Sequence, residues 1–123
     1  MDKYEKLRQR FYALTNEKWF CVNTYDRNFK EATNKSGVYY IAEISRNDLS
    51  NTNKIPEIVY IGSSTNLMAR YNRHEKIDFI RKNNKMPIFY FLEMNSGFYD
   101  LELKMIRKLR PKYNKMLYTG GKK

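Results

Sequence analysis

The chain has 123 residues, and 24 Lys and Arg against 13 Asp and Glu give it a formal charge of +11. One cysteine and one histidine exclude an intramolecular disulfide and a structural zinc site with four Cys or His ligands. No apolar run approaches the roughly twenty residues that span a bilayer. We expect no secretion signal, because no apolar stretch follows the charged residues of MDKYEKLRQR. We therefore expect one compact cytoplasmic domain with a polyanionic partner, most commonly DNA or RNA.

The first half of the chain is predicted to form one helix and two strands. Asp2–Leu14 is rich in helix formers, and its apolar residues recur every three or four positions. Residues 15–35 mix aromatic residues with Asn and Asp, which indicates an irregular stretch or a short strand. The runs GVYYIAEI, beginning at Gly37, and EIVYIG, after Pro56, predict paired strands because they are rich in β-branched and aromatic residues. The polar segment SRNDLSNTNKIP between them suits a long hairpin loop.

The second half, from residue 62 onward, holds 14 basic and 5 acidic residues and is predicted to add two helices and a strand. Cap residues ahead of helix formers predict a helix over Asn66–His74. The run IFYFLEM after Pro87 predicts a third strand. A strongly periodic helix over Tyr99–Leu109 is expected to end before Pro111, because proline restricts the residue that precedes it.

Together these elements predict an α+β fold, with a small, mostly antiparallel sheet of three strands flanked by helices. We expect residues 1–35 to form a helical extension packed on the core. Residues 36–118 are expected to form the main domain, and residues 119–123 a frayed tail.

Glu102 is the most informative single position. It shares the apolar stripe of the last predicted helix with Phe98, Met105, Ile106 and Leu109. An unpaired buried charge is costly, so this carboxylate must be neutralised, paired with Arg or Lys, or bound to a cation. A structural role, as an ion pair or as a carboxylate at the edge of the stripe near water, and a metal-binding role are equally open at this point.

Two further pairs of residues have both a structural and a functional interpretation. Arg70 and His74, four residues apart, share one face of the predicted helix. They form either a solvated basic edge or a site for phosphoryl chemistry, since guanidinium matches phosphate oxygens and imidazole transfers protons near neutral pH. Tyr39 and Tyr60 lie in paired strands, where facing positions put both phenols on one side of the sheet. Packed rings with satisfied hydroxyls are the alternative interpretation.

Four motifs follow one another in the chain: Gly37-Val38-Tyr39, then Tyr60-Ile61-Gly62, then Ser63-Ser64-Thr65-Asn66-Leu67 with Arg70 and His74, and finally the segment from Glu102 to Asn114. Together they resemble the GIY-YIG nuclease domain over residues 36–114, and the last segment is similar to the nuclease half of the bacterial excision-repair incision subunit. Valine replaces the isoleucine usual in the first motif. The two tyrosines lie farther apart than in the family, and we assign the excess to the loop SRNDLSNTNKIP.

The resemblance implies a metal-dependent DNA endonuclease that leaves a 3′-hydroxyl and a 5′-phosphate. Glu102 matches the carboxylate that holds the single divalent cation, Mg²⁺ or Mn²⁺. Tyr39 and Tyr60 match the phenols that line the site, one of which acts as general base on the attacking water. Arg70 matches the arginine that stabilises charge on the phosphoryl oxygens, and His74 is expected to assist proton transfer. Asn114 is also matched to a catalytic position, where it orients elements of the site by hydrogen bonding. The remaining matched positions, Gly37, Gly62 and Asn66, are structural.

Two other nuclease classes do not fit. Asp78 with Glu102 and Lys104 mimics the PD-(D/E)XK pattern, but helical periodicity places Glu102 and Lys104 about 200° apart. An HNH-type site needs more histidine than His74 supplies. The alternative function is a non-catalytic nucleic-acid-binding or partner-docking module of the same fold, which the basic second half favours. Restriction-like cutting of a symmetric DNA site would require a homodimer.

Overall fold

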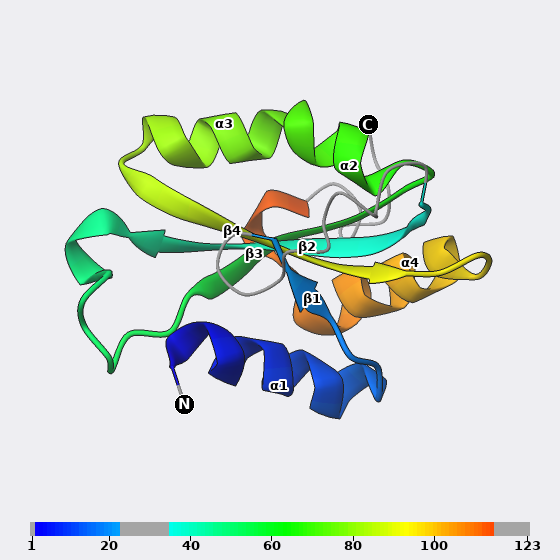
Figure 1. The fold of residues 1–123 in the computed structure, drawn as a ribbon, viewed down its shortest axis with the longest axis horizontal. Coiled ribbons are helices and arrows are strands. Elements are labelled where there is room, and N and C mark those ends of the chain that lie inside the picture. The colour runs from blue at the N-terminus through cyan, green and yellow to red at the C-terminus, as the bar shows by residue number, and fades with distance from the viewer. Residues whose placement is uncertain (1, 23–34, 115–123) are drawn as a thin grey trace.

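The computed structural model of the protein describes residues 2–22 and 35–114. Its helices and strands, in chain order, are α1 (Lys3–Thr15), β1 (Phe20–Cys21), β2 (Gly37–Ser45), the short 3₁₀ helix η2 (Arg46–Asp48), β3 (Glu57–Ser64), α2 (Leu67–Asn72), α3 (Glu75–Lys82), β4 (Lys85–Glu93), α4 (Phe98–Leu109) and the 3₁₀ helix η3 (Lys112–Asn114). The predicted α+β class is confirmed: helices cover both faces of one antiparallel sheet (Figure 1). The predicted tail, 119–123, lies outside the described residues.

The predicted number of strands is wrong, because the sheet has four strands in the order β1-β4-β2-β3. The additional strand, β1, pairs Phe20 with Phe91 and Cys21 with Tyr90. Two residues are too few to show the period-2 pattern by which a strand is found in a sequence. The helix predicted over Asn66–His74 is also too long, since α2 ends at Asn72 and a separate helix, α3, follows.

Strand β2 lies in the interior of the sheet and is buried along its length up to Ile44. Its side chains alternate between two apolar layers. Val38, Tyr40 and Ala42 face α1 and α4, whereas Tyr39 and Ile41 face α2 and α3. Burial on both faces explains why this strand is an unbroken apolar run in the sequence.

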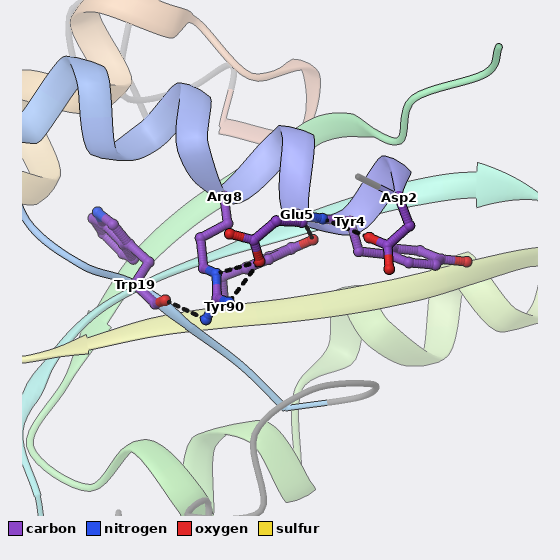
Figure 2. Close-up of polar contacts among 6 residues, drawn as sticks. All are labelled: Asp2, Tyr4, Glu5, Arg8, Trp19 and Tyr90. Carbon is purple, nitrogen blue, oxygen red and sulfur yellow. Dashed lines mark hydrogen bonds and ion pairs between the residues drawn. The ribbon is translucent and has the colours of Figure 1, made fainter. Parts of the chain in front are cut away.

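Helix α1 is held to the sheet by aromatic packing and by its polar side chains. Phe11 stacks on Tyr40 at a ring-centroid distance of 3.7 Å. Arg8 lies between Glu5 and the main-chain carbonyl of Trp19, to which it donates at 3.1 Å (Figure 2). The Tyr90 hydroxyl donates to the carbonyl of Tyr4 at 3.0 Å. The helix therefore packs on the same core as the sheet. In the part of the chain described, no helix is long and apolar enough to cross a membrane.

The hairpin of β2 and β3 sets the positions of the two tyrosines. Tyr39 pairs with Gly62, and Ile41 pairs with Tyr60. Positions two apart on a strand face the same side, so both phenols lie on the side covered by α2 and α3. The connection between β2 and β3 spans residues 46–56, within the predicted loop, and leaves this register intact.

Candidate active site

The hydroxyl of Tyr39 is the buried centre of a polar cluster. The side chain is 1% exposed and lies under α2 and α3. Its oxygen lies 2.8 Å from Nε2 of His74 and 3.3 Å from Nε of Arg70. These two residues approach from a different part of the chain, so the fold joins three of the predicted site residues at one oxygen atom.

His74 is not part of the predicted helix but the N-cap of the next one. Its Nδ1 accepts a hydrogen bond from the backbone N–H of Lys76 at 3.1 Å. Since Nδ1 accepts, the proton of the neutral ring is on Nε2, which donates to Tyr39. Burial, followed by the charge of Arg70, lowers the pKa of His74 to about 4. The ring is 1% exposed, so the interpretation of Arg70 and His74 as a solvated basic edge is wrong for His74.

Tyr60 and Gly62 complete the cluster on strand β3. The rings of Tyr39 and Tyr60 are 6.2 Å apart and nearly parallel, and His74 is edge-on to both. Burial raises the pKa of both phenols. A Cβ atom on Gly62 would lie 2.4 Å from the Tyr39 hydroxyl, so only glycine leaves room for this phenol. The expected arrangement of both phenols on one side of the sheet is confirmed.

Glu102 lies on α4 and reaches the same strand from the other face of the sheet. The residue is 8% exposed, and Oε1 accepts a hydrogen bond from Ser63 at 2.5 Å. Burial raises the pKa of its carboxyl group, and the hydrogen bond from Ser63 offsets only part of this rise. Among residues 2–22 and 35–114, no Lys, Arg or His forms an ion pair with Glu102. The structural ion pair that the sequence left open is therefore absent from the described residues.

The carboxylate of Glu102 and the two phenols lie on opposite sides of the edge strand β3. The apolar residues of α4, Met105 and Ile106, belong to the core layer that includes α1, whereas Tyr39 belongs to the opposite layer. Burial is the main cause of the raised pKa of both phenols, and the negative charge of Glu102 adds to it. Gly62 packs against the Tyr39 phenol and Ser63 donates to Glu102, so these two adjacent residues of β3 connect the two sides of the sheet.

Glu75 is a member of the cluster that the sequence did not indicate. Its two carboxylate oxygens face the terminal nitrogens of Arg70 at 3.1 and 3.2 Å. The Arg70 guanidinium, in turn, lowers the pKa of Glu75 to about 2. A Glu in the first turn of a helix is ordinary helix chemistry, so nothing in the sequence singles out this one. Ser63, the partner of Glu102, was equally hidden among the cap residues that precede α2.

The remaining predicted residues support the backbone around the cluster. Asn114 uses both ends of its amide on the backbone of Ile61, accepting from N–H at 2.8 Å and donating to C=O at 2.9 Å. This clamp fixes β3 next to Tyr60. Asn66 is the N-cap of α2 and accepts from the N–H of Ala69. Gly37 lies so close to β4 that a Cβ would meet the carbonyl of Leu92.

The donor set suits a hard cation held by few protein atoms. Among the described residues there is no group of three His, Cys, Asp or Glu that could form a full metal cage. Mg²⁺ does not need one, because it keeps several waters and binds through one or two carboxylates plus substrate oxygens. A buried carboxylate with a hydroxyl neighbour and without a basic partner among residues 2–22 and 35–114 fits that requirement.

A scan against protein-family models and searches of curated proteins and of solved structures found no match to this chain.

The burial of His74 predicts how acid destabilises the fold. The pKa is 6.5 in an unfolded chain and about 4 in the folded one, so the unfolded state binds the proton first and stability falls as the pH drops from 6.5 towards 4. We expect wild-type protein to lose about 1.4 kcal/mol per pH unit relative to His74→Gln in this window. Urea unfolding of both proteins at pH 7 and pH 5 measures the difference. An equal loss in both would contradict a neutral, buried His74.

Proposed function

We propose that the protein is a metal-dependent DNA endonuclease of the GIY-YIG type. The observation that carries the proposal is the contact of a guanidinium and an imidazole with one buried phenol oxygen, together with a carboxylate across strand β3 that has no basic partner in the described chain. Structural ion pairs and packed aromatic rings do not require that combination. Phosphodiester hydrolysis can use each member: the phenol as a base, the imidazole as a hydrogen-bond donor to that base, the guanidinium as a positive charge for the phosphate and the carboxylate as a metal ligand.

In this proposal Glu102 holds the cation, and Ser63 fixes the orientation of its carboxylate. A bound Mg²⁺ or Mn²⁺ supplies a Lewis acid that polarises phosphate oxygens and lowers the pKa of water. Arg70 adds a fixed positive charge, since its guanidinium remains charged at every working pH. Its place beside both phenols suits the stabilisation of charge that develops on a phosphate.

Tyr39 is the better candidate of the two phenols for general base. Its oxygen accepts from Arg70 and from His74, so two donors would stabilise a phenolate there. Its own proton is then directed away from both donors. Burial opposes ionisation and raises the pKa, so this base needs the positive charges of the complete site. We therefore assign His74 the role of a neutral donor to Tyr39.

Supercoiled plasmid provides the direct test. Purified protein with Mg²⁺ or Mn²⁺ should convert it to nicked circles, and EDTA should stop the reaction. The ends should be 3′-hydroxyl and 5′-phosphate, which a ligase rejoins without prior treatment. Tyr39→Phe should reduce the rate more than Tyr60→Phe does. Plasmid that stays intact with both metals, at low and moderate salt, would rule the proposal out.

One observation favours a second candidate, a cytoplasmic DNA-binding or partner-docking module without turnover. The pKa values of both phenols are raised, which disfavours a phenolate in the isolated chain. Such a module would bind labelled DNA with strong salt dependence but would not cut it with any metal. A homodimer is expected only if the enzyme cuts a symmetric site, and sequencing the cut ends of a genomic library would reveal that symmetry.

A further inference from the structure

All three nitrogens of the Arg70 guanidinium donate to protein groups. Nε donates to Tyr39, and the two terminal nitrogens lie 3.1 and 3.2 Å from the two oxygens of Glu75. This is the two-point geometry that arginine uses for both carboxylates and phosphates. The carboxylate therefore occupies the position in which a phosphate would bind most favourably to Arg70.

Glu75 is placed so that it can leave. Its side chain is 63% exposed, against 31% for Arg70, so the carboxylate can move into water without a cavity or a new buried charge. Arg70 is tied to the buried Tyr39 and stays in place. An incoming phosphate would thus displace Glu75, not Arg70.

We propose that Glu75 is a specificity-determining residue that competes with phosphate for Arg70. The inference rests on the proposed function and adds a filter to the same site. A single small phosphate forms much the same two-point contact with Arg70 that Glu75 already forms. Displacing the carboxylate therefore yields little net binding free energy. A DNA strand makes several backbone contacts at once, and these offset the loss of the Arg70–Glu75 pair. The protein would therefore reject free phosphate and retain DNA.

The test measures binding without metal, so that it does not depend on cutting. A short labelled duplex is titrated in EDTA, and its Kd is read by fluorescence anisotropy. Glu75→Gln should bind roughly tenfold more tightly than wild type. Glu57→Gln is the matched control, because Glu57 is also 63% exposed and also pairs with a cation, Lys112 at 3.6 Å. The control should shift the Kd far less.

A double-mutant cycle separates competition at Arg70 from the general effect of removing a negative charge. In an Arg70→Ala background, Glu75→Gln should change the Kd no more than Glu57→Gln does. Inorganic phosphate should shift the Nε–H signal of Arg70 by NMR in Glu75→Gln at concentrations that leave the wild-type signal unmoved.

Weaker DNA binding by Glu75→Gln would overturn the inference, because it would show that Glu75 only braces Arg70. An equal gain with and without Arg70 would overturn it too, since the effect would then be charge alone. Failure of the proposed function gives a different result: plasmid remains uncut while the Kd differences and the NMR shift are still observed.

Discussion

Glu102→Gln should reduce metal-dependent nicking by roughly 10³-fold while the protein remains folded and still binds DNA. Glutamine keeps the shape of the side chain and an oxygen that can accept from Ser63. It removes only the negative charge that would hold the cation. The measurement is the initial rate of plasmid nicking, with DNA binding followed in parallel. Asp100→Asn, an exposed position on the same helix, is the matched control and should cut at the wild-type rate.

The same substitution should leave stability unchanged or raise it. Burial raises the pKa of Glu102. At a pH above the pKa of an ordinary glutamic acid, keeping this carboxylate charged in the folded protein therefore lowers its stability. The neutral variant avoids this cost, and its advantage should shrink as the pH falls and Glu102 takes up a proton. Mg²⁺ should raise the Tm of the wild type but not that of the variant. A large loss of stability in Glu102→Gln would instead indicate a structural carboxylate.

Gly62→Ala is expected to have the second large effect, through Tyr39. The new methyl group would lie 2.4 Å from the Tyr39 hydroxyl and 2.5 Å from the adjoining ring carbon. The phenol cannot swing away, because it stacks on Phe89 at a centroid distance of 4.9 Å and is buried. Overpacking of this kind costs about 1–3 kcal/mol, and a displacement of about 1 Å at a reacting group lowers rates by roughly 10²-fold.

Thermal unfolding and the nicking rate of Gly62→Ala measure the two effects. Tyr39→Leu shortens the opposing side chain, so adding Gly62→Ala to that background should cost less stability than it does in the wild type. Wild-type stability and rate in Gly62→Ala would show that the ring has more freedom than its contacts indicate.

Periodicity and strand composition predicted the parts of the structure that depend on many residues at once. Helix α4 begins one residue before the predicted start, and its apolar stripe correctly placed Glu102 on the buried side. The runs that follow Gly37 and Pro56 became the paired strands that carry both tyrosines. In each case, five or more residues repeat the same pattern, so single exceptions do not hide it.

Features that depend on one or two residues were missed. The break between α2 and α3 falls at Arg73 and His74, where no glycine or proline marks the end of a helix. The histidine leaves the helix because its ring caps α3 and meets Tyr39, and this tertiary contact has no local signal in the sequence. Glu75 is hidden for the same reason, because its importance comes only from the position of Arg70.

The amide of Asn114 also determines how other chains can meet this protein. Strand β3 is the last strand of the sheet, and an edge of this kind normally offers its N–H and C=O groups to a strand of another molecule. At Ile61 both groups are already taken by Asn114. Strand addition at this rim is therefore blocked at Ile61, beside the site, and a second chain cannot extend the sheet through these two groups.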